Sequence, residues 1–194
     1  MSLKVGGVSK DKPARISGPG APAHGDLGYN GGPTISCPRI YAAFWGPHWQ
    51  DATHQAQSQR LIQFLKDLIA SDWMNILSQY GGGTGKNSGV YVTDAFAPNV
   101  TGTLSDGSIH ATLQAQINNG SLPEPQAKNT SDVVIIYLDE TVAVRDPNLA
   151  VMCEPSGDNA FGYHNYFTTS KGNNCYYAVI PSLSNSCIVN TCPS

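Results

Sequence analysis

The chain has 194 residues, of which 13% are charged, and a formal net charge of -3. This length suits one domain with a sizeable core and is short for two independent ones. The small net charge argues against binding to nucleic acid or to an anionic membrane surface. The longest apolar run, at residues 133–138, is far shorter than the roughly 20 residues of a membrane-spanning helix, so a soluble protein is expected.

The N-terminal residues 1–32 are rich in glycine, proline and charge and have no apolar period, which predicts a flexible arm. The basic residues of this arm are not followed by the apolar run of a signal peptide. Residues 33–194 are expected to form one domain. Asn-x-Ser/Thr triplets at Asn99, Asn119 and Asn129 favour an extracellular protein, while the lack of a visible signal peptide leaves a cytoplasmic location open.

The first strand is predicted at residues 38–46, "PRIYAAFWG", which are β-prone and bounded by proline and glycine. A helix is predicted from Asp51 onward, because apolar residues then recur every three or four positions. These residues are Leu61, Ile62, Leu65, Leu68 and Ile69. Ser71 is predicted to cap a second short helix that continues to Tyr80 and turns Trp73, Ile76 and Leu77 inward.

The segment "YGGGTGKNSG" at residues 80–89 has some features of a phosphate-binding loop. Such a loop needs glycine, four residues and then Gly-Lys-Ser/Thr, with a strand before it and a helix after it. Here Tyr80 stands where the first glycine belongs, and Asn87 stands where the hydroxyl belongs. We therefore predict a connector between a helix and a strand, and no nucleotide-binding site.

The second half of the chain is predicted to mix strands and helices. A strand is expected at residues 89–97, and the next helix is capped by Ser105 or Asp106 and stops at Gly120. The apolar run "DVVIIYLDE" fits a strand covered on both faces, and a long loop should follow it to Gly157. Residues 163–168 and 175–180 could pair as two late strands. This order predicts an α/β fold in which helices cover a central mixed sheet.

Asp139 and Glu140 follow the predicted buried strand directly. Acidic residues at the carboxyl end of such a strand lie where α/β proteins often build functional sites. They also fit the start of a solvated loop, which is the interpretation that we prefer from the sequence.

The five cysteines are unevenly placed, with Cys37 alone and the other four near the C-terminus. Cys187 and Cys192 enclose a short loop that a disulfide could close, and Cys153 with Cys175 would form the natural second pair in an oxidising compartment. Reduced, buried thiols are the alternative. Zinc binding by cysteine is not expected, because the chain has no Cys-x-x-Cys pair.

The five histidines are scattered, and no pair has the spacing of a helical zinc site. There is also no Gly-x-Ser-x-Gly elbow for a serine nucleophile. His164 in "FGYHNYF" stands out because aromatic neighbours would desolvate it. It is a candidate metal ligand or catalytic residue, together with Asp139 and Glu140.

Several segments together resemble the Exordium family, also called phosphate-induced proteins, and its fungal and bacterial relatives. The likeness runs in order from Tyr29 to Cys192. Its segments are "YNGGPTI", "IYAAFWG", "SDWMNILSQY", "LPEP", "VVIIYLDE", "CEPSGDNAFGYHNYF" and "YYAVIP". The resemblance implies an extracellular protein with a zincin-like core. Many relatives carry a His-Glu-x-x-Glu helix after the equivalent of "CIVNTCPS", and this chain ends at Ser194 before such a helix, so no residue inherits a catalytic role.

Three functional interpretations follow. The preferred one is a non-enzymatic extracellular or cell-surface Exordium-like protein with an incomplete zincin-like scaffold and no cofactor. The second is a zinc-dependent, peptidase-like hydrolase, either as a fragment of a longer enzyme or through an unusual site of His164, Asp139 and Glu140. The third is a lectin-like protein in which Trp45, Trp49 and Tyr163 stack on sugar rings. Expected partners are cell-wall or surface glycans, another protein, or a second copy of the chain.

Overall fold

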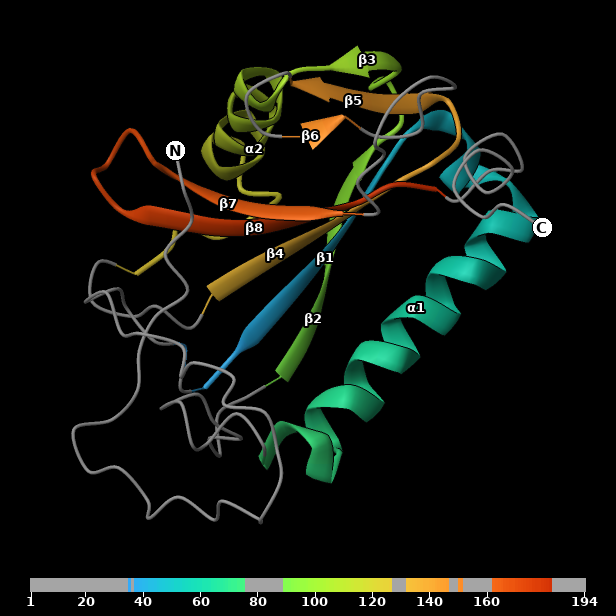
Figure 1. The fold of residues 1–194 in the computed structure, drawn as a ribbon, viewed down its shortest axis with the longest axis vertical. Helices are drawn as coiled ribbons and strands as arrows, with labels where there is room; N and C mark the ends of the chain where they lie inside the picture. Colours follow the sequence, from blue (N-terminus) through green and yellow to red (C-terminus); the bar gives the residue numbers. More distant parts are fainter. Residues whose placement is uncertain are drawn as a thin grey trace, which may run out of the picture.

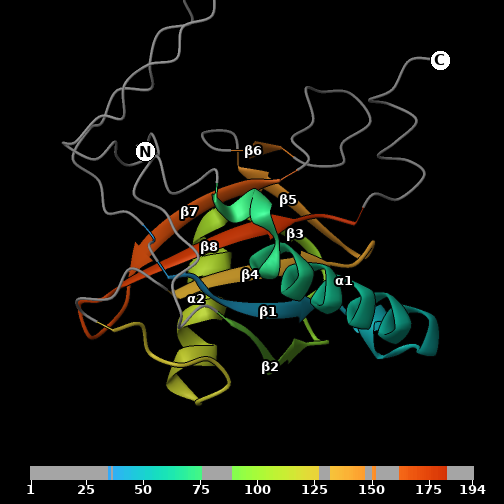
Figure 2. The ribbon, with the colours of Figure 1, turned by 90° about the horizontal axis from the view of Figure 1, so that it is seen from below.

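The structure, a computed structural model, describes residues 35, 37–75, 89–126, 132–146, 150–151 and 162–182. Within these ranges the chain forms a five-stranded mixed sheet, two α-helices and a smaller sheet, which confirms the predicted α/β class. The strands of the large sheet, in spatial order, are β2 (Gly89–Ala97), β1 (Arg39–Trp45), β4 (Asp132–Leu138), β8 (Asn174–Ile180) and β7 (Tyr163–Thr168). Figure 2 shows this order from one end of the molecule.

The first four of these strands are parallel, and β7 is antiparallel to β8. Two charged residues stand opposite each other where β1 and β4 begin: Arg39 Nε and Nη2 donate to the two carboxylate oxygens of Asp132 at 2.7 and 2.8 Å. A bidentate pair of this kind is geometrically specific, so it helps to fix the register of the two central strands.

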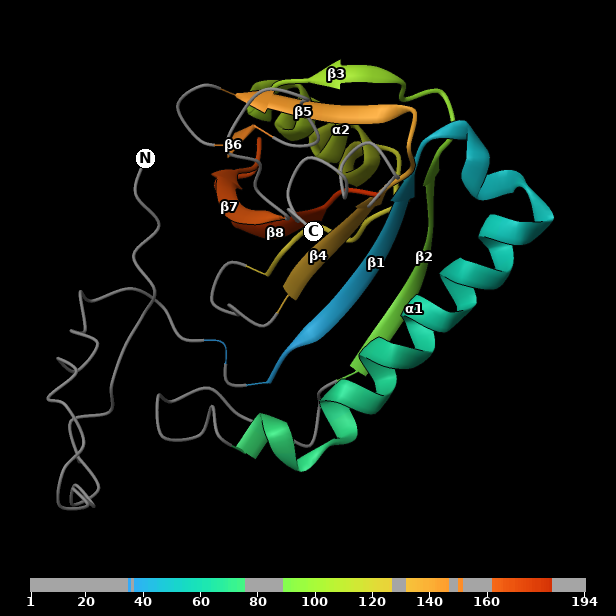
Figure 3. The ribbon, with the colours of Figure 1, turned by 45° about the vertical axis from the view of Figure 1, so that its right-hand side comes forward.

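Side chains alternate between the two faces of the large sheet. From β1, Ile40 and Phe44 pack with helix α1 (Ala52–Ala70), whereas Tyr41 and Trp45 pack with helix α2 (Asp106–Asn118) on the opposite face. The small sheet covers the same face as α2 and consists of β3 (Gly102–Leu104), β5 (Val142–Asp146) and β6 (Ala150–Val151). Figures 1 and 3 show α1 alongside β1 and β2. In both views α2, β3 and β5 lie together at the top of the molecule, away from most of α1. Strand β4 is covered on both faces, as predicted.

The amphipathic patterns located both helices correctly. In α1, Ile62 and Leu65 are buried, and in α2 the buried apolar residues include Ile109 and Leu113. Ser105 caps α2, since its side-chain oxygen accepts from the backbone N–H of Ser108 at 3.2 Å. Neither α-helix among the described residues is long and apolar enough to cross a membrane.

The prediction for the end of α1 was partly wrong. Ser71 is the C-terminal cap of α1, and its hydroxyl donates to the backbone oxygen of Leu68 at 2.7 Å. Residues 72–75 form a tight 3₁₀ turn that buries Met74 and leaves Trp73 56% exposed, so Trp73 does not point inward. The remainder of the predicted second helix lies outside the described residues.

The long loop predicted after Glu140 is also wrong in its first part, because β5 begins at Val142 and β6 follows it. Val142 and Val144 alternate with more exposed residues and enter the core beneath α2. Their burial depends on α2, a helix from another part of the chain. The local sequence of residues 142–146 does not show that contact and therefore predicted a loop. The predicted arm, the glycine-rich segment 80–88 and Cys153, Cys187 and Cys192 lie outside the described residues.

Cys175 is only 2% exposed and forms no disulfide within the described residues, which do not include its predicted partner Cys153. The pairing therefore stays a prediction. Burial, followed by the nearby charges of Glu124 and Asp132, raises the pKa of the Cys175 thiol from 9.0 to about 12.

This thiol predicts a pH dependence of stability. Below pH 9.0 the folded and unfolded chains both keep the proton; between 9.0 and about 12 only the folded chain does, so stability falls as pH rises. In urea denaturation across this window, the wild type should lose about 1.4 kcal/mol per pH unit more than Cys175→Ala. Parallel stability curves for the two proteins would contradict the prediction.

Candidate metal centre

Two segments that leave the large sheet at the same edge build the candidate site. After β1 the chain passes Gly46, forms the 3₁₀ helix η1 (Pro47–Gln50) and enters α1, while Asp139 and Glu140 follow β4. After β1 the chain adds the next strand of this sheet, β2, on one side, whereas after β4 it adds β7 and β8 on the other side. Ligands of open α/β sheets bind at such a reversal of strand order, outside the carboxyl ends of the strands.

Asp139 joins these two segments. Its side chain is 1% exposed, and its carboxylate accepts from the backbone N–H of His48 at 2.8 Å, the backbone N–H of Thr141 at 2.8 Å and the Thr141 hydroxyl at 2.5 Å. Gly46 comes so close that a Cβ atom there would lie 2.1 Å from the Asp139 carboxyl carbon. Asp139 is therefore a buried anchor of η1, and the preferred interpretation of it as part of a solvated loop was wrong.

The anchor brings His48 and His54 to Glu140. His48 Nδ1 lies 2.7 Å from one carboxylate oxygen of Glu140, and His54 Nε2 lies 3.3 Å from the other. All three potential ligand atoms lie within 4.8 Å of one another. The side chains of His48, His54 and Glu140 are 40%, 22% and 37% exposed, so the cluster opens to solvent.

Electrostatics favours the charged forms of His48 and Glu140. The hydrogen bond to Glu140 raises the pKa of His48. Burial would raise the pKa of Glu140, but hydrogen bonds from its own backbone and from His48, with the charge of His54, outweigh that effect and lower it. A metal ion at this position would compete with the proton on His48, because a ligating imidazole is neutral.

His54 is held by groups on its other side. Its Nδ1 atom is buried, has no hydrogen-bond partner among the residues that the structure describes, and lies 4.0 Å from a carboxylate oxygen of Asp51. The indole of Trp49 meets the His54 ring edge-on, with centroids 5.8 Å apart. Metal-ligating histidines commonly donate their second ring N–H to a carboxylate, and Asp51, at 4.0 Å, would have to move closer to accept that hydrogen bond.

No protein-family model, curated protein or solved structure matches the chain. The resemblance to the Exordium family stays a prediction.

Of the three candidates singled out from the sequence, only Asp139 and Glu140 belong to this site. His164 is exposed on β7, where it stands opposite Ala178 of β8, and it is not part of the cluster. In the part of the chain that the structure describes, His48, His54 and Glu140 are the one group of His, Cys, Asp or Glu residues close enough to share an ion. The five residues between the two histidines match no known motif, so neither was singled out.

The predicted sugar-stacking residues have other surroundings. Trp45 is 0% exposed and Trp49 is 3% exposed, so packing in the two halves of the core occupies the ring faces that a sugar would need. The Tyr163 hydroxyl donates to Asp106 at 2.8 Å. Asp106 is a buried carboxylate on α2 that also contacts Tyr177, Asn165 and His110. That network joins the β7–β8 hairpin to α2.

Proposed function

We propose that the chain is a metal-dependent hydrolase in which His48, His54 and Glu140 hold a zinc ion. The observation that carries this proposal is the convergence of two imidazole nitrogens and a carboxylate within 4.8 Å. Two histidines and one glutamate form a known ligand set of catalytic zinc, and three protein ligands leave the fourth position for water or substrate.

The surrounding residues suit such a centre. Zinc, when bound, lowers the pKa of a coordinated water to about 7 and polarises a substrate carbonyl. The Asp139 carboxylate accepts from the backbone N–H of His48 at 2.8 Å and so holds this residue in place. The partial exposure of His48 and Glu140 gives water and substrate access to the fourth position. Acyl transfer to water is the reaction class that this arrangement supports.

The non-enzymatic Exordium-like function, extracellular or at the cell surface, is the second candidate. What supports the lack of a metal in this candidate is that the Glu140 carboxylate lies 2.7 and 3.3 Å from ring nitrogens of His48 and His54, because these contacts can satisfy the three side chains without an ion. The two candidates differ in a measurable way, because only the first requires stoichiometric metal.

Calorimetric titration of metal-free protein with zinc tests the proposal. We expect one zinc per chain, and at least about 100-fold weaker binding in His54→Ala and in Glu140→Gln, because each removes a direct ligand. A panel of ester, peptide and amide substrates should be hydrolysed by the zinc-loaded protein and not after chelation.

The matched control is His164→Ala, which removes an exposed histidine from β7, outside the cluster. It should bind zinc as the wild type does. If wild-type protein binds no stoichiometric zinc, or if His164→Ala weakens binding as much as His54→Ala, the assignment of the ligands is wrong. Stoichiometric zinc without hydrolysis of any substrate in the panel would keep the metal site and reject the hydrolase.

A further inference from the structure

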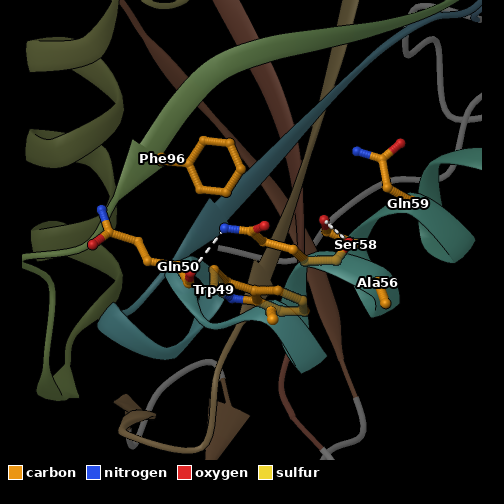
Figure 4. A pocket seen from close by; sticks show the side chains of 8 residues that line it. Trp49, Gln50, Ala56, Ser58, Gln59 and Phe96 are labelled. Atoms are coloured by element: carbon orange, nitrogen blue, oxygen red, sulfur yellow. Dashed lines mark hydrogen bonds between the residues drawn. The ribbon is translucent and has the colours of Figure 1, made fainter.

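A pocket of about 720 Å³ lies between the start of α1, the end of η1 and the end of β2. This volume is within the usual range for small-ligand sites, roughly 300–1,000 Å³. The residues that matter for its chemistry are Trp49, Gln50, Gln55, Ser58, Gln59 and Phe96. Figure 4 shows Phe96 on one side, Trp49 on the other, and Gln50 and Gln59 toward opposite ends. No ligand of the candidate metal centre lines the pocket.

Among the residues that the structure describes, those that line this pocket are all uncharged. An ion would therefore lose hydration without gaining an opposite charge. A wholly apolar ligand would cover three glutamine amides without offering them hydrogen bonds, which is also unfavourable. The lining thus selects a neutral ligand with many hydrogen-bonding groups.

Parts of the lining are held in place before any ligand binds. Gln55 Nε2 donates to the backbone oxygen of Gln50 at 2.8 Å, and the Ser58 hydroxyl donates to the backbone oxygen of Gln55 at 2.9 Å. The Phe96 ring stacks on buried Phe44, with centroids 5.7 Å apart and an interplanar angle of 24°. Phe96 nevertheless stays 39% exposed, so a fixed aromatic surface borders a set of amides.

We propose that this pocket binds a neutral carbohydrate, with a sugar ring placed against Phe96. A pyranose presents C–H groups on its faces and hydroxyl groups around its rim. The C–H face suits the phenyl ring, while the hydroxyls both donate and accept, as the amides of Gln50 and Gln59 do. Trp49 contributes a wall of the pocket and not a stacking surface, because it is 3% exposed.

A peptide is the competing ligand, and the pocket suits it less well. Extended peptides gain much of their affinity from hydrogen bonds to backbone groups of the binding protein. Here the Gln50 backbone oxygen already accepts a hydrogen bond from Gln55. The lining offers a ligand the side-chain amides of Gln50 and Gln59. The carbohydrate proposal does not depend on the metal centre, and chelated protein can be used to test it.

The experiment is calorimetric and NMR titration of the full chain, in the presence of a chelator, with neutral cello-, chito-, xylo- and manno-oligosaccharides. At least one series should bind. Phe96→Ala and Gln59→Leu should each weaken that binding by about tenfold or more, because one removes the stacking surface and the other an amide. Gln59→Leu keeps the proposal testable if Phe96→Ala fails to fold.

Tyr91→Ala is the matched control, since Tyr91 is a second exposed aromatic residue of β2, at 45%, that does not line the pocket. It should bind sugar as the wild type does. The proposal is overturned if no neutral oligosaccharide binds at millimolar concentration, if a peptide library binds in place of sugars, or if Tyr91→Ala weakens binding as much as Phe96→Ala. Loss of zinc binding with retained sugar binding would reject only the metal centre.

Discussion

Gly46→Ala is expected to lower the free energy of unfolding by about 3 kcal/mol or more. Gly46 has φ 119° and ψ 154°, a conformation that is essentially restricted to glycine. The added methyl group would also lie 2.1–2.3 Å from the carboxyl atoms of Asp139, which is inside any tolerated contact. Asp139 cannot move away freely, because it is buried and bonded to the backbone of His48 and Thr141.

The same substitution should weaken zinc binding, because Asp139 positions His48 through its backbone N–H. The control is Gly120→Ala, at a residue with φ 81° where a Cβ would meet nothing within 4 Å. It should cost only about 1–2 kcal/mol, the strain of positive φ alone. Urea denaturation and zinc titration of both variants give the two readouts. Equal destabilisation by the two substitutions would show that the contact with Asp139 is unimportant.

Local sequence patterns were sufficient to predict the helices and strands that bury a regular apolar face. The spacing of Ile62 and Leu65 located α1, and the continuous apolar run located β4 as a strand covered on both sides. The short strands β3, β5 and β6 have only two to five residues. β3 and β5 pair with each other and contact α2, and β6 pairs with β5; none of these neighbours is visible in the local sequence.

Only part of the candidate site could be predicted from the sequence, for the same reason. Glu140 was singled out because it follows a buried strand, but His48, its partner at 2.7 Å, is 92 residues away in the sequence. The two meet because β1 and β4 are adjacent and parallel, with Trp45 opposite Leu138 where the strands end. Strand order is a property of the whole sheet. Had the adjacency of β1 and β4 been known, residues just after each strand would have been the natural candidates.

Two of the buried carboxylates, Asp139 and Asp106, have related tasks. Asp139 fixes η1 to the end of β4 and so places His48 next to Glu140. Asp106, at the start of α2, ties that helix to the β7–β8 hairpin, and β8 is the neighbour of β4. Each carboxylate accepts several hydrogen bonds in a place where an unpaired donor would be costly.

Asp106→Ala is accordingly expected to destabilise the fold by about 3–5 kcal/mol. Asp106 is 8% exposed, and its carboxylate accepts from the hydroxyls of Tyr163 and Tyr177 and from Asn165 Nδ2 at 3.0 Å. His110 Nε2 lies 3.1 Å from it. The substitution removes this shared acceptor, and of the contacts within the network the one between His110 Nε2 and the Tyr177 hydroxyl, at 2.8 Å, remains. Burial is the largest cause that raises the pKa of both tyrosines, and it persists in the variant, so neither hydroxyl can relieve the loss by ionising near neutral pH.

Tyr163→Phe is the matched control, because it removes one donor and leaves the carboxylate bonded to the others. It should cost about 1 kcal/mol. Asp106→Asn should fall between the two, since the amide keeps the shape and one acceptor but turns a donor toward Asn165 and His110. Equilibrium urea denaturation ranks the three variants, and a loss for Asp106→Ala no larger than that for Tyr163→Phe would contradict the role of the network. Zinc binding should persist in folded Asp106→Ala, because among the described residues the network contacts none of His48, His54 and Glu140. Loss of zinc binding in this variant would mean that the β7–β8 hairpin supports the carboxyl edge of the sheet.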